Sequence, residues 1–299
     1  MIPHKNTQRN KVSLFNLSLF LIPLFSFSTL LQAEENQAIG QAPEEDVSHL
    51  FLRDSEVLLK PRQLQLSIGF NYNSDENQRS FRKNRNRTLS LPFGISYGVT
   101  DNLELNASLP LRYQRNEVIA PTNVSKQAQS GIGDLSLGLS YKVKPETENS
   151  PSITTSFGVT APTAKKEMGS NVWGVSTGLH LSKSIDPAVV FANVGYQHTF
   201  KDKQKGLTIQ SGDVFSYGFG AGLSINSSVS FSGRVSGSYQ LETKRNGNKI
   251  IGSSAEPISF IAGMSYRLNR KTRLETNLNL GLSDDAGDVG IGISYIWNL

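Results

Sequence analysis

Apolar and polar residues alternate with a period of two in twelve stretches of this chain, and this pattern constrains the fold more than any other feature. In the clearest stretch, residues 63–72, the apolar side chains are Leu64, Leu66, Ile68, Phe70 and Tyr72. Successive side chains of a β-strand point to opposite sides of a sheet, so each stretch predicts a strand with one apolar and one polar face. The sequence therefore predicts an all-β fold.

The connections between these stretches predict a barrel that crosses a membrane. Long or charged connections alternate with short ones, which is typical of an up-and-down transmembrane barrel and not of a soluble sandwich. We expect a closed antiparallel barrel of about 12 strands, with both termini in the periplasm and the long connections outside the cell. The expected strands lie near residues 63–72, 87–99, 103–115, 135–143, 152–161, 172–182, 188–200, 214–225, 229–242, 257–268, 272–282 and 288–299. The segments 73–86, 116–131, 201–213 and 243–256 are expected to be loops.

Aromatic residues collect at the two ends of the expected strands. Side chains with an apolar body and a polar edge gather at the two interfaces of a membrane. We therefore expect an outer girdle and an inner girdle on the lipid-facing surface. The outer girdle would contain Tyr72, Tyr113, Trp173, Phe200, Phe215, Tyr217, Tyr239 and Phe260, and the inner one Tyr97, Tyr141, Tyr266, Tyr295 and Trp297.

The first residues read as a signal peptide over residues 1–33. Lys5, Arg9 and Lys11 form a basic head, an apolar run follows, and Ala33 offers a cleavage point before Glu34. The alternative is a retained membrane anchor, because the apolar run is nearly long enough to span a membrane. A cleaved signal followed by a transmembrane barrel places the mature protein in the outer membrane of a Gram-negative bacterium.

A periplasmic segment, residues 34–62, is expected between the signal and the barrel domain at 63–299. Val47, Leu50, Phe51, Val57 and Leu58 recur at helical spacing, which predicts a short helix over 47–59. Such a helix would either plug the lumen from the periplasm or lie under its rim.

The charge balance does not imply a nucleic-acid partner, and none is expected. The chain has 30 basic and 25 acidic residues, and removal of the three basic residues of the signal leaves a net charge of +2. The chain has no cysteine, so it forms no disulfide. Basic clusters in the expected outer loops predict contact with lipopolysaccharide phosphates by charge attraction, or capture of an anionic solute.

The inward positions are mostly Gly and Ser, and small side chains leave space inside the barrel. Twelve strands tilted at about 40° would leave a bore of about 10–14 Å. The charged or titratable inward candidates are Glu104, Arg112, Asp134, Lys142, His180, Arg234, Arg267, Arg273 and Glu275. They would form either a selectivity lining that favours anions or Arg–Glu pairs between neighbouring strands that brace the wall.

The chain does not read as an enzyme. Beyond the signal only His49, His180 and His198 are available, and the His-x-Ser-Asn run of outer-membrane phospholipases is absent at His198. An acidic pair at Asp284 and Asp285 is better interpreted as a loop turn. We therefore expect no catalysis, no cofactor and no metal site.

Two hairpin motifs resemble a known barrel family. The run 91–105 (LPFGISYGVTDNLEL) and the run 131–135 (GIGDL), with the lead-in 57–61 (VLLKP), are similar to the outer-membrane barrel family named for the meta-pathway of phenol degradation. The resemblance implies a transporter. Related barrels export functional-amyloid polypeptides, but they carry a long coiled-coil region before the barrel that is missing here.

These features predict an outer-membrane channel for passive passage of small solutes, with aromatic and anionic solutes as the candidate classes. The alternatives are an exporter of an unfolded or amyloid-forming polypeptide, and a structural or adhesive barrel with a closed lumen. The last stretch resembles the terminal strand that the barrel assembly machinery recognises. Its outward side chains are Ile291, Ile293, Tyr295, Trp297 and Leu299.

Overall fold

The computed structural model describes residues 58–79, 82–120, 123–164, 168–204 and 206–299. The expected signal peptide, His49 and all but the last two residues of the expected 47–59 helix lie outside these residues. Leu58 and Leu59 are described, and neither is helical. Among the described residues, no helix is long and apolar enough to cross a membrane.

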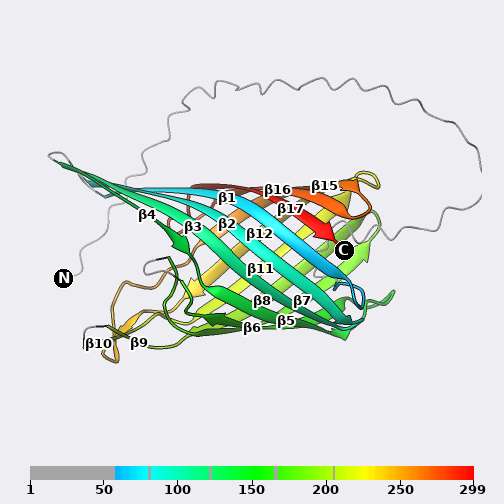
Figure 1. Ribbon diagram of the computed structural model, residues 1–299, viewed down its shortest axis with the longest axis horizontal. Helices are drawn as coiled ribbons and strands as arrows, with labels where there is room; N and C mark the ends of the chain where they lie inside the picture. Colours follow the sequence, from blue (N-terminus) through cyan, green and yellow to red (C-terminus); the bar gives the residue numbers. More distant parts are fainter. Residues whose placement is uncertain (1–57, 80–81, 121–122, 165–167, 205) are drawn as a thin grey trace, which may run out of the picture. The chain divides into compact units, whose positions relative to one another are not determined.

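All regular structure in the described part of the chain is β-strand (Figure 1). The strands are β1 (Leu64–Arg79), β2 (Arg82–Thr100), β3 (Leu103–Ala120), β4 (Asn123–Ile132), β5 (Leu135–Lys144), β6 (Ser152–Ala161), β7 (Gly174–Ile185), β8 (Ala188–Thr199), β9 (Asp202–Gln204), β10 (Leu207–Gln210), β11 (Val214–Ser224), β12 (Val229–Gln240), β13 (Lys244–Arg245), β14 (Asn248–Lys249), β15 (Ile258–Asn269), β16 (Thr272–Gly281) and β17 (Val289–Asn298).

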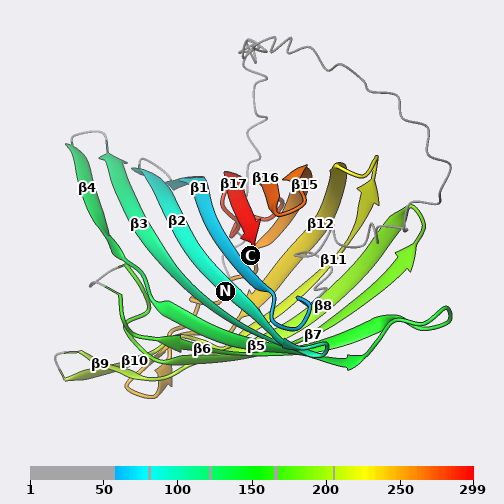
Figure 2. The same ribbon diagram turned by 45° about the vertical axis from the view of Figure 1, so that its right-hand side comes forward.

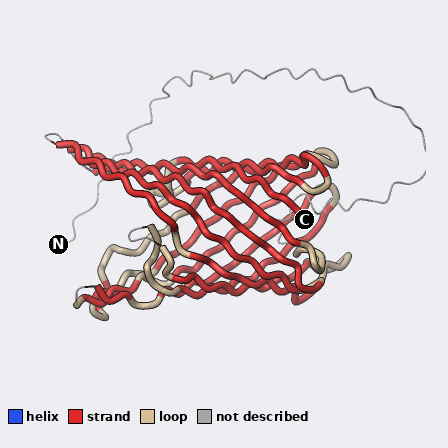
Figure 3. The backbone as a smooth tube through the Cα atoms, in the orientation of Figure 1, coloured by secondary structure: helices blue, strands red, loops and turns tan. Residues whose placement is uncertain are grey.

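The first and last strands pair with each other, and this pairing closes the barrel. β1 is hydrogen bonded to β2 on one side and to β17 on the other, from Gln65 opposite Asn298 to Ser74 opposite Val289. The ring runs β1-β17-β16-β15-β12-β11-β8-β7-β6-β5-β3-β2, and β4 is attached to β3 only. The result is the predicted closed antiparallel barrel of twelve strands, which cross the barrel obliquely (Figure 3).

The apolar side chains cover the outside of this barrel and do not form a core between two layers. Along β17, the odd positions from Val289 to Trp297 are exposed, and the even positions Gly290 to Ile296 are buried on the inner side. The same alternation holds on β5, where Leu137, Leu139 and Tyr141 are exposed. A continuous outward apolar surface of this kind matches lipid, because the hydrocarbon core of a membrane offers no polar partner.

The barrel has a loop end and a turn end. The loop end carries the β1–β2, β3–β4, β6–β7, β8–β11, β12–β15 and β16–β17 connections. The turn end carries the β2–β3, β5–β6, β7–β8, β11–β12 and β15–β16 connections and Asn298. Short turns such as 101–102 and 270–271 join strands at the turn end.

Two of the segments expected to be loops are strands instead. Most of 73–86 continues β1 and β2, and most of 116–131 forms the end of β3 and the whole of β4. These extensions, called here the wing (residues 74–79, 82–88, 114–120 and 123–129), project beyond the rest of the wall (Figures 1 and 2). The period-two signal ended at Tyr72 and Tyr113 because the outward side chains beyond them are charged, although backbone pairing continues.

The loops expected at 201–213 and 243–256 also contain strands. β9, β10, β13 and β14 form a separate four-stranded sheet at the loop end. β10 joins the two connections, because it pairs with β9 on one side and with β13 on the other.

Candidate functional site in the barrel lumen

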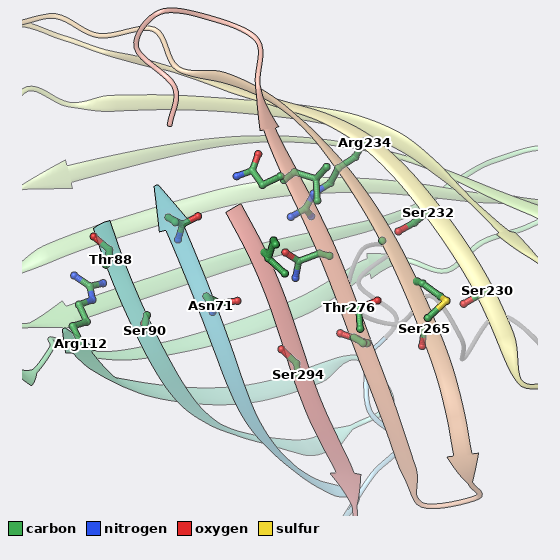
Figure 4. Close-up of a pocket in the computed structure, with 18 residues that line it drawn as sticks. Asn71, Thr88, Ser90, Arg112, Ser230, Ser232, Arg234, Ser265, Thr276 and Ser294 are labelled. Atoms are coloured by element: carbon green, nitrogen blue, oxygen red, sulfur yellow. The ribbon is translucent and has the colours of Figure 1, made fainter. Parts of the chain in front are cut away.

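A cavity of about 620 Å³ lies on the inner side of the wall formed by β1, β2, β12 and β15–β17 (Figure 4). Its lining is dominated by hydroxyl and amide groups, and no aromatic side chain belongs to it among the described residues. The polar and charged members include Asn71, Asn73, Thr88, Ser90, Arg112, Ser230, Ser232, Arg234, Ser265, Glu275, Asn277, Asn279 and Ser294. Uncharged hydrogen-bonding groups therefore outnumber charges at this part of the lumen.

Four asparagines of this lining were not among the candidates predicted from the sequence. Asn71 and Asn73 belong to β1, and Asn277 and Asn279 belong to β16. The signal was present as an Asn-x-Asn pattern on the inward face of two strands. Sequence reasoning missed it because that reasoning considered charged inward residues first.

Arg112 contacts a loop that folds against the inner wall. Its Nη1 donates a hydrogen bond to the carbonyl oxygen of Met168 over 3.2 Å. Met168 follows β6 in the connection to β7, and it is only 3% exposed. The Arg112 side chain therefore both lines the cavity and supports this loop.

Asp134 anchors the same loop. Its carboxylate accepts hydrogen bonds from the Ala164 backbone N–H at 3.0 Å, the Ser170 backbone N–H at 2.6 Å and the Ser170 hydroxyl at 2.8 Å. The carboxylate is buried, and these donors satisfy its charge. Asp134 thus positions the β6–β7 loop on the inner side of the wall.

At the turn end, residues before the first strand enter the lumen. The Leu59 backbone N–H donates to Glu104 Oε2 over 2.9 Å, and Leu58 and Leu59 are both buried. A second cavity of about 230 Å³ lies between this segment and the wall. A Cβ at Gly98 would collide with the Lys60 carbonyl oxygen. The absence of a side chain at Gly98 therefore allows residues 59–60 to lie close to the backbone of β2.

The other candidates predicted from the sequence lie along the wall. Arg273 Nε forms an ion pair with Glu275 Oε1 over 2.8 Å. This pair lies along β16 and not between neighbouring strands. His180 Nε2 lies 3.4 Å from the Ser156 hydroxyl. Lys142 stands opposite Thr154, Arg267 opposite Arg273, and Arg234 lines the large cavity.

His198 belongs to a polar cluster on the outward face near the loop end. Its Nδ1 lies 2.7 Å from Asp213 Oδ1, and the Tyr196 hydroxyl donates to Asp213 Oδ2 over 3.0 Å. A hydrolase of the phospholipase type needs a hydroxyl nucleophile bonded to the histidine. In the part of the chain that the structure describes, no Ser or Thr hydroxyl is hydrogen bonded to His198, and no cluster of metal-ligating side chains occurs.

The aromatic residues expected in the two girdles are all exposed. Beyond Tyr72 and Tyr113 the outward face of the wing carries ion pairs, among them Arg85 with Glu76 at 2.8 Å and Arg115 with Glu117 at 2.6 Å. Hydrogen bonds from Lys83 and then from Arg85 hold the pKa of Glu76 below its usual value. The change from aromatic to charged side chains along these strands marks the edge of the apolar outer surface of the barrel.

The closed ring, the outward apolar band and the polar interior define an integral β-barrel of the bacterial outer membrane. Residues 67–299 match the family described as "Putative MetA-pathway of phenol degradation", and the chain belongs to this family. This confirms the resemblance seen in the hairpin motifs.

Solved structures agree on the fold. An outer membrane channel from Pseudomonas putida F1 is 16% identical, with a TM-score of 0.68 over 81% of this chain and 97% of that chain. The NanC porin is 10% identical, with a TM-score of 0.51 over 79% of this chain and 100% of that chain. The translocator domain of the autotransporter NalP from Neisseria meningitidis is 9% identical, with a TM-score of 0.50 over 84% and 93%. At these identities the likeness concerns the barrel architecture alone.

Proposed function

We propose that this protein is a passive outer-membrane channel for small solutes. The observation that carries the proposal is the polar cavity of about 620 Å³ on the inner wall, which a barrel with a purely structural role would not need. The β6–β7 loop and residues 58–60 narrow the lumen at different heights. The path therefore suits small molecules better than a folded or bulky cargo.

Anionic and aromatic solutes are the candidate classes that the sequence raised. Arg112 and Arg234 support anion attraction, because both line the large cavity and Glu275 is the one acidic residue among its described lining residues. Support for aromatic solutes comes from the description of the family and not from the lining, which contains no aromatic ring among the residues that the structure describes. We propose that the loop end faces the cell exterior, since its connections carry the wing and the four-stranded sheet.

Two partners follow from the surface. The wing's outward basic side chains Lys83, Arg85, Arg87, Arg115 and Lys126 exceed the acidic Glu76 and Glu117, and they lie just beyond the aromatic girdle. We propose that they contact phosphates of lipopolysaccharide, which stand at this height in the outer leaflet. β17 would serve as the strand that the barrel assembly machinery recognises.

Single-channel recording in planar bilayers tests the channel. The full chain is expected to conduct KCl in discrete steps, and Asp134→Ala is expected to conduct more because its loop loses an anchor. A barrel that stays silent in both forms would leave the closed structural barrel as the better interpretation. Reversal potentials in a KCl gradient would then report the preference for anions.

A further inference from the structure

The four asparagines of the large cavity face one another across a strand that has no side chain at that level. Asn71 and Asn277 both stand opposite Gly292, and Asn73 and Asn279 both stand opposite Gly290. β17 lies between β1 and β16, so each glycine has one asparagine on each side. These four residues are called here the asparagine patch.

The glycines allow the amides to converge. A Cβ on Gly292 would lie 2.5 Å from both Asn71 Oδ1 and Asn277 Nδ2, closer than real contacts allow. A Cβ on Gly290 would collide with Asn73 Oδ1 in the same way. The absence of side chains on β17 therefore lets amide groups from two strands occupy one surface of the cavity lining.

Three polar atoms on the same cavity have no hydrogen-bond partner among the described residues. They are Asn279 Oδ1, Ser230 Oγ and Ser265 Oγ. Ser230 is 1% exposed and Ser265 is 9% exposed, so bulk water reaches neither of them freely. Buried polar groups in native proteins are normally paired with protein, water or ligand. Asn279 belongs to the asparagine patch, and Ser230 and Ser265 line the same cavity. The three atoms together indicate a place where a polar molecule completes the hydrogen bonding.

We propose that the asparagine patch, together with Ser230 and Ser265, is a binding subsite for a small hydroxyl-rich solute of monosaccharide size. The inference rests on the proposed channel function and names its solute class. An amide offers both donors and acceptors, as a sugar hydroxyl does, so a ring of hydroxyls pairs with amides without a change of charge on either side. An aromatic solute would leave these amides unpaired, at the cost of their desolvation.

The charges around the cavity are compatible with a neutral solute. Arg112 already donates to Met168, and Glu275 lies in an ion pair with Arg273. Arg234 lies on β12 and Arg112 on β3, and they stand far apart along the lining in Figure 4. The amides and hydroxyls between them form the longer, uncharged part of the surface.

Equilibrium binding to the detergent-purified full chain tests the subsite independently of conduction. Saturation-transfer NMR would be recorded with glucose, glucuronate and benzoate as the three probes. The patch variant is Asn71→Leu with Asn277→Leu. The matched control is Gln65→Leu with Asn298→Leu, an amide pair at the turn end of the same wall whose members are hydrogen bonded to each other at 2.8 Å. Heat-dependent gel mobility would establish that each variant is a folded barrel.

Glucose is expected to bind the unmodified chain and the control with equal affinity, and to bind the patch variant roughly tenfold more weakly, as expected for the loss of one or two hydrogen bonds. Glucuronate should bind about as well as glucose, and benzoate more weakly. The proposal is overturned if glucose shows no saturable binding, if the patch variant binds it unchanged, or if benzoate binds better. If the protein conducts KCl but does not bind glucose, the subsite is rejected and the channel function stands. If it binds glucose but does not conduct, the subsite stands and the channel function is rejected.

Discussion

The outward and inward faces of the same strands follow different rules, although they are one residue apart. On β5, Leu139 is 37% exposed toward lipid, and the next residue, Ser140, lines the lumen cavity at the turn end. The outward face tolerates any apolar side chain, because fluid lipid tails adapt to the shape of the side chains that they contact. The inward face depends on the identity of each side chain, since Asp134, Arg112 and the asparagine patch each meet a particular partner or space.

The wing extends this comparison along the strand. The same outward face that is apolar at Ile68 and Phe70 carries Glu76 a few residues later, and β2 and β3 change in the same way. The type of side chain found on the outward face therefore depends on whether lipid or water surrounds that part of the barrel, and not on the strand itself. The backbone hydrogen bonds between β1, β2 and β3 continue unchanged where the outward side chains become charged.

The largest effect on stability is expected from a charge placed on the outward face of β5, and almost none from a charge placed on the inward face. Leu139→Arg should destabilise the barrel by up to about 2–4 kcal/mol, the cost of an arginine at the midplane of the lipid-facing wall. The lower part of this range is expected, because the ring of Tyr141 at the membrane interface is two residues away. Ser140→Arg should leave stability nearly unchanged, because the new charge stands opposite Glu104 in the lumen. Urea unfolding in lipid vesicles, followed by tryptophan fluorescence, measures both. Equal losses in the two variants would contradict the assignment of the faces.

A smaller effect is expected from the loop anchor on the inward face. Asp134→Ala removes three hydrogen bonds of about 1 kcal/mol each, so the β6–β7 loop should open about a hundredfold more often. Hydrogen exchange at the Ala164 and Ser170 amides reports the opening. Asp134→Asn keeps one acceptor oxygen and should show an intermediate rate. Unchanged protection in Asp134→Ala would mean that the loop is held by other contacts.

The next effect concerns selectivity. Replacing Arg112 and Arg234 by Gln removes two positive charges from the cavity lining, and the reversal potential in a KCl gradient should move toward the cation side. Each charge should contribute on the order of 1 kcal/mol to the anion's energy in a wet lumen. Lys249→Gln at the exposed loop end is the control and should leave the potential in place. A shift of the same size in the control would assign selectivity to the mouth.

The smallest effect is expected from a change of pH on the stability of the wing. Lys83 and Arg85 lower the pKa of Glu76, so this carboxylate contributes stability that is present above its ordinary pKa of 4.5 and is lost as the pH falls through the lowered value. Exposed ion pairs contribute about 0–1 kcal/mol, and salt screens them. The amide protection factors of the β1–β2 pairing should fall in acid, and less so in Glu76→Gln. An acid response that survives this substitution would point to Glu117 instead.

Much of the barrel could be predicted from the sequence because strand faces are a local property. The alternation placed β6 at residues 152–161 and β8 within one residue of its observed end. The same reasoning shortened β1 to β3, since it followed apolar side chains and these end where the wing begins. It also placed Asp134 and Glu104 in the lumen without indicating that one holds a loop and the other holds Leu59.

The sequence by itself determined the two faces of the twelve barrel strands, their number and hence a closed barrel in a membrane, because a period of two needs only neighbouring residues. Only the tertiary structure decided which inward residues meet. Asn71 and Asn277 are separated by about two thirds of the chain and share Gly292 through the register of β1, β17 and β16. Register depends on how distant strands align when the ring closes, and no local pattern records it.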